Sequence, residues 1–187
     1  MPAFSSRLRY GAVAQLFHWT TVVLVITAYL LGEGGPQSRV YAPERAFTLS
    51  AHETLGVLVL LLTVLRLAWR AMDRTPDNIP MPRLMLIASR AVHGLLYVLL
   101  LALPLTAIFG AWFQGHPVTL FGGVLPIGPL TAVDGAFGNS LADVHGTLGN
   151  AILWVAGLHA AAALLHHFVM RDRVLMTMLP GRSATDA

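Results

Sequence analysis

Four long apolar segments with few or no charged residues dominate this chain of 187 residues. They cover residues 11–31, 50–70, 88–113 and 141–170. Each reaches the length of about 20 residues that a helix needs to cross the hydrocarbon core of a bilayer. None alternates apolar and polar residues in the short segments, about 10 residues long, that membrane barrels use. The sequence therefore predicts one all-α membrane domain over residues 1–187, a four-transmembrane-helix bundle in contact with membrane lipid.

The composition supports a membrane protein and narrows its chemistry. The chain is 56% hydrophobic and only 11% charged, whereas about a quarter of the residues of a soluble domain are charged. It has no cysteine, which excludes disulfides, iron–sulfur clusters, thiolate zinc sites and covalent attachment of haem. All basic charge is on arginine, and the arginines lie at the ends of the apolar segments. This distribution indicates membrane topology and no nucleic-acid partner.

The arginines also predict which way the segments run. Ten of them flank the N-terminus, the second connection or the C-terminus: Arg7, Arg9, Arg66, Arg70, Arg74, Arg83, Arg90, Arg171, Arg173 and Arg182. The first connection has only Arg39 and Arg45, and the third has none. Because basic residues stay on the cytoplasmic side, we expect both termini in the cytoplasm.

The third connection, from about residue 114 to 139, is long, apolar and rich in glycine and proline. We expect it to fold over the outer face of the bundle. Asn139 or Ser140 could cap the last helix, because short polar side chains accept from the first free N–H groups.

Histidines inside the apolar segments are the candidate functional residues. His145 and His159 are fourteen residues apart, a rise of about 21 Å on a helix that returns to within about 40° of its starting direction. Given the predicted orientation, His52 and His145 lie near the outer face, and His18 and His159 lie in the inner half. Ionisable residues inside a membrane segment are costly, which favours a functional role.

Two pairs of histidines at two depths suit two b haems, each with two axial imidazoles. Gly56, Gly146 and Gly149 lie near these histidines and could let a flat macrocycle approach a helix. Two alternatives stay open for the histidines: hydrogen bonds between helices, and a zinc or copper site, for which only Glu53 and Asp143 are near.

Further residues have possible roles at the same sites. His166 is seven residues after His159, and it could bond to a quinone head group or itself be the inner ligand. His93 is either a rival ligand or a contact of the third segment, His167 suits an interfacial position, and His116 is in the outer loop. Arg66, fourteen residues after His52, could pair with a haem propionate or a quinone, or extend to the interface.

Several motifs resemble one family. The run from Gly157 to His167 reads GLHAAAALLHH and is similar to the last helix of the bacterial cytochrome b561 family. Other matching pieces are Phe17-His18-Trp19, His52 followed by Gly56, Ala102-Leu103-Pro104, and Leu141 to His145. The resemblance covers about residues 6–180, and is strongest to members that oxidise superoxide.

This resemblance implies a bundle in the bacterial inner membrane that holds two b haems on His18, His52, His145 and His159. It also implies an oxidoreductase that takes electrons from superoxide at the periplasmic side and reduces ubiquinone towards the cytoplasm. Arg39 and Arg45 could then attract the superoxide anion, and His166 and Arg66 could contact the quinone.

Two further function classes stay open. The chain could be a cytochrome subunit that passes electrons between the quinone pool and a protein partner, such as a hydrogenase or a periplasmic carrier. A protein of a non-redox ion pathway is the third class. Co-purification of a partner would favour the subunit, and a reduced-minus-oxidised spectrum would separate both cytochromes from the ion pathway.

Overall fold

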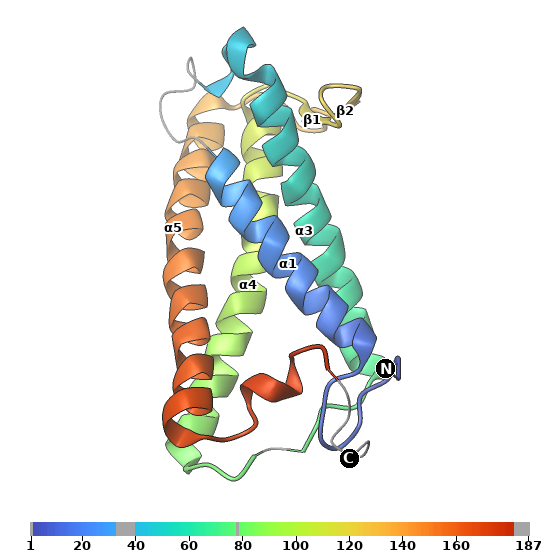
Figure 1. Cartoon of the computed structure of the whole chain (residues 1–187). Helices are drawn as coiled ribbons and strands as arrows, with labels where there is room; N and C mark the ends of the chain where they lie inside the picture. Colours follow the sequence, from blue (N-terminus) through green and yellow to red (C-terminus); the bar gives the residue numbers. More distant parts are fainter. Residues whose placement is uncertain (1, 33–39, 78, 182–187) are drawn as a thin grey trace.

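The computed structural model describes residues 2–32, 40–77 and 79–181. Its long helices are α1 (Ala12–Leu31), α3 (Ala46–Met72), α4 (Arg83–Phe113) and α5 (Gly135–Leu165), and they form an elongated bundle (Figure 1). The shorter elements are the 3₁₀ helix η1 (Pro43–Arg45), the strands β1 (Val118–Leu120) and β2 (Leu125–Ile127), the π-helical turn η2 (His166–Met170) and the 3₁₀ helix η3 (Leu175–Thr177).

All four long helices are long and apolar enough to cross a membrane. Their outward faces are apolar too: Leu16, Trp154 and Leu158 are 67%, 77% and 67% exposed. A helix that is apolar on every side needs an apolar environment on every side. The four-helix membrane fold that the sequence predicts is therefore confirmed, although α4 and α5 begin five and six residues earlier than expected.

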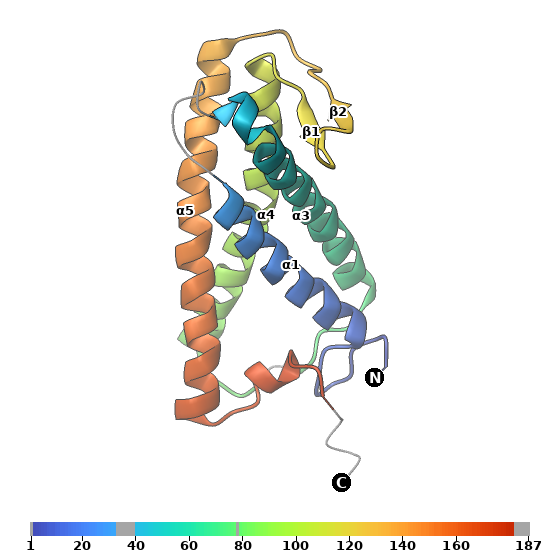
Figure 2. The same ribbon diagram turned by 45° about the horizontal axis from the view of Figure 1, so that its top comes forward.

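The bundle is built from two helix pairs. α1 packs along α3, α4 packs along α5, and α3 joins the pairs through α4 (Figure 2). A compact cluster of Val59, Leu99, Leu100 and Ile152 lies where α3, α4 and α5 meet. This cluster holds the middle of the bundle together, and the histidines lie on either side of it along the helices.

The start of α5 differs from the expectation. Asp134 is the N-cap, and its carboxylate accepts a hydrogen bond from the N–H of Phe137 at 3.1 Å. Asn139 and Ser140 lie inside the helix, so the prediction that one of them caps it was wrong. The physical reason is that Gly138 lets α5 continue towards its N-terminus beside Gly110 of α4, where a Cβ would come within 3.0 Å of the Gly110 oxygen.

The third connection folds back on the bundle as expected. β1 and β2 pair antiparallel, with Val118 opposite Ile127, and Val118 and Leu120 are buried. The other edge of β1 is bonded by α3: the Ser50 hydroxyl donates to the carbonyl of Thr119, and the Glu53 carboxylate accepts from the N–H and the hydroxyl of Thr119. Side chains of α3 thereby fasten the hairpin over one end of the bundle.

The N-terminal segment and the chain after α5 meet at the opposite end (Figure 1). The N–H of Tyr10 donates to the carbonyl of Thr177 at 3.2 Å, and the indole N–H of Trp19 donates to the carbonyl of Met178 at 2.9 Å. Arg9 also donates to the carbonyls of Leu179 and Gly181. The α3–α4 connection lies at this arginine-rich end, which we call the inner end; the hairpin marks the outer end.

Candidate functional site

The outer pair consists of His52 on α3 and His145 on α5, whose ring centres lie 6.0 Å apart. The Nδ1 of His52 bonds to the carbonyl of Ala28 at 2.8 Å, and the Nδ1 of His145 bonds to the carbonyl of Leu103 at 2.9 Å. Because a carbonyl only accepts, both Nδ1 atoms carry the proton, and each Nε2 of the neutral ring keeps a free lone pair. This is the tautomer that an imidazole needs to bind a metal through Nε2.

Each of these carbonyls accepts a second hydrogen bond besides the one from the histidine. The carbonyl of Ala28, in the last turn of α1, also accepts from the N–H of Gly32 at 2.8 Å, because a carbonyl oxygen has two lone pairs. The carbonyl of Leu103, directly before Pro104 of α4, also accepts from the hydroxyl of Thr106 at 2.9 Å. The proline that the sequence motif contains therefore lies beside the group that orients His145.

The inner pair consists of His18 on α1 and His159 on α5, with ring centres 6.4 Å apart. His93 of α4 lies closer to His159, at 5.0 Å between ring centres, and its Nδ1 bonds to the carbonyl of Ser89 at 2.6 Å. Three histidines thus meet at the inner level, and either His18 or His93 could be the second axial ligand opposite His159.

The ring separations distinguish these rivals. A metal–imidazole bond is about 2 Å long, and each ring nitrogen is about 1.1 Å from its ring centre, so two axial imidazoles have centres about 6 Å apart. The separations of 6.0 and 6.4 Å match this value, and 5.0 Å is too short. The geometry favours His18 over His93 as the partner of His159.

Glycines next to the pairs leave room for a flat group. A Cβ built on Gly56 or Gly146, in the outer half, would meet nothing within 4 Å, and the same is true of Gly94 and Gly157 near the inner pair. Gly149, also singled out from the sequence, faces a methyl group of Leu103 at 4.0 Å. The imidazole donors and this open space fit b haem.

Gly32 is a site residue that sequence reasoning missed. A Cβ there would lie 3.0 Å from Cε1 and 3.2 Å from Nδ1 of His52. A larger residue at the end of α1 would therefore crowd the His52 ring where it reaches the Ala28 carbonyl. Nothing in the sequence around Gly32 indicates that it faces a histidine twenty residues away.

Arg66 lies at the inner level, as its spacing from His52 predicts. Its Nη2 is 3.4 Å from Nδ1 of His18, and its guanidinium lies 5.5 Å from the ring centre of Tyr97. Arg70, one turn later, lies 5.7 Å from the same ring. One positive charge thus lies beside the inner pair and a second lies over Tyr97, where they could neutralise a carboxylate.

His166 lies at the inner end of α5 and contacts Asp172, which sequence reasoning did not select. The Nδ1 of His166 is 2.5 Å from the Asp172 carboxylate. Its neighbour His167 instead contacts the ring of Phe168. The two adjacent histidines therefore have different surroundings, as the sequence predicts.

The outer end has a polar cluster, and the structure describes one of the two arginines expected there. Arg45 ends η1, just before α3, and Arg39 lies outside the described residues. The Tyr41 ring stacks on His116 at 3.7 Å, and the Tyr41 hydroxyl donates to Gln114 at 3.1 Å. Burial, together with the nearby Glu53 carboxylate, raises the pKa of Tyr41 to about 12. His116 is thus packed against an aromatic ring.

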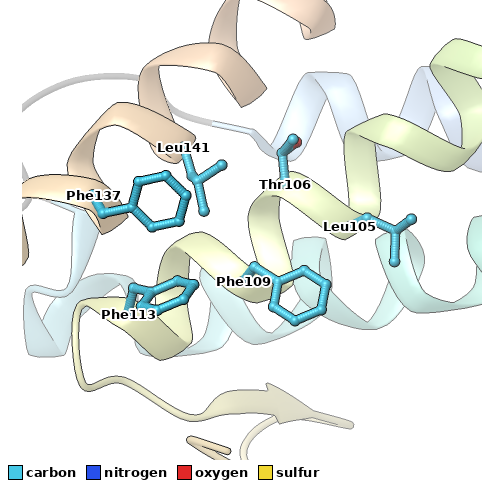
Figure 3. A pocket seen from close by; sticks show the side chains of 6 residues that line it. All are labelled: Leu105, Thr106, Phe109, Phe113, Phe137 and Leu141. Atoms are coloured by element: carbon cyan, nitrogen blue, oxygen red, sulfur yellow. The ribbon is translucent and has the colours of Figure 1, made fainter. Parts of the chain in front are cut away.

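Two further observations concern metal ligands and a pocket near the outer end. Among the described residues, no three histidine, aspartate or glutamate side chains come together as direct ligands of a metal ion. An apolar pocket lies between the outer ends of α4 and α5 (Figure 3). It is lined by Leu105, Thr106, Phe109, Phe113, Phe137 and Leu141. The Thr106 hydroxyl donates to the carbonyl of Ala102, so this pocket offers only carbon surface.

Comparisons with known proteins agree with the geometry. The sequence profile of prokaryotic cytochrome b561 matches residues 9–181. A probable superoxide oxidase, CybB, of Yersinia pestis is 32% identical over 92% of this chain and 96% of that protein. Cytochrome b561 homolog 2 of Escherichia coli is 31% identical over 95% and 94%, and cytochrome b562 of Cereibacter sphaeroides is 30% identical over 92% and 96%. The chain belongs to the prokaryotic cytochrome b561 family, whose members are b-type cytochromes of membrane electron transfer.

Proposed function

We propose that this cytochrome binds two b haems, one on His52 and His145 and one on His18 and His159. The observation that carries the proposal is the separation of the ring centres, 6.0 and 6.4 Å, in two pairs at different depths. When bound, b haem supplies reversible one-electron storage. The protein orients the outer rings through the Ala28 and Leu103 carbonyls and surrounds both pairs with apolar helices.

The proposed reaction oxidises two superoxide anions to two oxygen molecules at the outer end. The two electrons released, with two protons taken up from the inner side, reduce one ubiquinone to ubiquinol. Similarity to a probable superoxide oxidase supports this reaction. Arg45, and Arg39 by its position in the sequence, would supply positive charge that attracts the anion. His166 and Arg66 at the inner level would contact ubiquinone, and Arg66 could instead bind a haem propionate.

We further propose that the chain lies in the bacterial inner membrane with both termini in the cytoplasm. Ten of its twelve arginines lie in or next to the termini and the second connection, and basic residues remain on the cytoplasmic side. The hairpin end would then face the periplasm, where superoxide would arrive.

A second candidate function is a cytochrome subunit that exchanges electrons between the quinone pool and a protein partner, such as a hydrogenase or a periplasmic carrier. Two relatives favour it, because their names identify them only as cytochromes b561 and b562. The same histidine pairs would serve both functions, so the electron donor decides between them.

The test is performed on detergent-purified protein expressed with a haem supply. We expect two low-spin b haems per chain, extractable by acid-acetone because no cysteine is present. His52→Ala and His145→Ala should remove one haem, and His18→Ala and His159→Ala the other. A single haem in the wild type would contradict the proposal, as would loss of a haem in His93→Ala with both retained in His18→Ala.

The reaction is tested by stopped-flow spectroscopy with superoxide and then ubiquinone. We expect superoxide to reduce the protein faster than superoxide dismutates spontaneously, and ubiquinone to reoxidise it. Replacing Arg39 and Arg45 by glutamine should slow only the first step, and most at low salt. Reduction no faster than dismutation would favour the subunit.

A further inference from the structure

The chain leaves α5 in an unusual way that returns an acidic residue to the helix. The π-helical turn η2 (His166–Met170) ends at Arg171, whose φ of 55° and ψ of 37° are left-handed. The next N–H, that of Asp172, donates to the carbonyl of His166 at 3.1 Å. An α-helix continued to position 172 would have put this side chain about 240° around the axis from His166.

This reversal makes an oriented pair. One carboxylate oxygen of Asp172 lies 2.5 Å from Nδ1 of His166, and the other accepts from the N–H of Val174 at 2.9 Å. Partial burial acts to raise the pKa of Asp172, but the hydrogen bonds from His166 and Val174 outweigh it and hold that pKa below its ordinary value. The carboxylate therefore stays ionised at neutral pH and accepts the Nδ1 proton.

The hydrogen bond between Asp172 and His166 also determines which nitrogen of the imidazole is accessible. The side chain of His166 is 13% exposed and that of Asp172 is 20% exposed. His166 is two helical turns from His159 on the same helix, whereas Asp172 belongs to the connecting segment at the inner end. With Nδ1 bonded to Asp172, only Nε2 of His166 is left to meet another molecule.

We propose that Asp172 is a positioning residue that holds His166 as the proton donor to ubiquinone. The inference rests on the proposed quinone function and assigns its proton source. As two electrons from the cytochrome's reductant enter the quinone, the imidazolium of His166 transfers its Nε2 proton to a quinone carbonyl oxygen. His166 keeps its Nδ1 proton on Asp172, regains the Nε2 proton from water at the inner end, and supplies the second proton of the quinol in the same way.

Few charged groups belong to the described segments next to His166. On the segment itself they are His167, Arg171 and Arg173, and η3, which packs against η2, has no titratable side chain. The last two turns of α5 contribute only His159. Asp172 is thus the acidic group that these elements bring to His166, and its carboxylate occupies the Nδ1 side of the ring.

The test compares Asp172→Asn, Asp172→Glu and the control Asp77→Asn in the haem-loaded protein. Asp77 is an exposed aspartate of the α3–α4 connection. The first readout is the ¹⁵N spectrum of the histidine rings in the reduced protein, with the His166 signals assigned by their loss in His166→Gln. The second is the pH profile of reoxidation by ubiquinone after reduction with dithionite.

We expect the wild type and Asp172→Glu to show Nδ1–H on His166, and Asp172→Asn to lose this preference. In Asp172→Asn the reoxidation rate at pH 7 should fall about tenfold and the pH profile should differ from that of the wild type, because one adjacent opposite charge is lost. Superoxide reduction, and every property of Asp77→Asn, should be unchanged.

The positioning role and the quinone function fail in different ways. An unchanged His166 tautomer and an unchanged pH profile in Asp172→Asn, with normal ubiquinone reduction in the wild type, would overturn the role of Asp172 alone. A wild type that does not reduce ubiquinone would overturn the quinone function and its proton donor together, whatever the ¹⁵N spectrum shows.

Discussion

Replacing Gly32 by alanine should weaken the outer site and leave the inner site intact. The new Cβ would lie 3.0 Å from Cε1 of His52, whereas ordinary contacts begin at 3.4 Å, so the ring must move by about 0.4 Å. Movement directly away from α1 would lengthen the bond to the Ala28 carbonyl from 2.8 Å to about 3.2 Å, the limit for N–H···O bonds.

The magnitude follows from the role of that hydrogen bond. Loss of a group that orients a metal-bound histidine costs about 10–100-fold in affinity, which corresponds to about 1.4–2.7 kcal/mol. We therefore expect outer haem to dissociate 10–100 times more readily, with a shifted spectrum for that haem only. The assay is haem transfer to an apo-acceptor protein, followed by optical and EPR spectra of the haem that remains.

The matched control is Gly135→Ala. Gly135 is the first residue of α5, and a Cβ there would meet nothing within 4 Å, so haem retention should equal that of the wild type. Equal haem retention and equal spectra in Gly32→Ala would refute the link between the end of α1 and the outer histidine.

Three other predictions concern the two ends of the bundle. Tyr41 should ionise at about pH 12, so its stabilising contribution is complete below pH 10 and is lost as the pH rises towards 12. The measurement is phenolate absorbance against pH, in which the transition near pH 12 should be missing from Tyr41→Phe. A transition of Tyr41 near pH 10 would contradict the prediction. Glu53→Ala leaves the N–H of Thr119 without its acceptor, which should lower the free energy of unfolding by about 1–3 kcal/mol and speed hydrogen exchange at the Thr119 amide. The control Glu44→Ala should change neither quantity. Partial burial acts to raise the pKa of Asp73, but two hydrogen bonds from Ser5 lower it. The contact between Ser5 and Asp73 should therefore hold above about pH 4 and weaken as the pH falls further. Hydrogen exchange at the Ser5 amide that is equally slow in the wild type and in Asp73→Asn would contradict this prediction.

The sequence was sufficient for the spans and for the histidine pairs. The length of the segments with few or no charged residues predicts helices that cross a membrane. The order and direction of these spans predict that His52 lies at the depth of His145, and His18 at the depth of His159. The ring contacts of 6.0 and 6.4 Å agree with that pairing; the ligand roles stay predictions. Such inference succeeds because a helix fixes depth and direction with two constants, the rise and the turn per residue.

The sequence was insufficient where backbones approach closely. Gly135 and Gly138 resemble loop residues, yet both belong to α5, because Gly138 fits against Gly110 of α4 and Gln114, the residue that caps α4. Asp172 was missed for a related reason. Its contact with His166 depends on a π-helical turn and a left-handed Arg171, and no residue pattern near them predicts either conformation.

That both pairs draw one member from α5 has a consequence for how this chain can vary. His145 and His159 are joined by uninterrupted helix, so the geometry of α5 alone fixes the spacing of the two pairs, independently of where α1, α3 and α4 pack. One residue inserted between them would rotate one histidine about 100° away from its partner. Four inserted residues would nearly restore its direction but lengthen the gap by about 6 Å. Insertions and deletions should therefore be tolerated in the connections and excluded from the stretch of α5 between His145 and His159, which sets the distance between the two pairs.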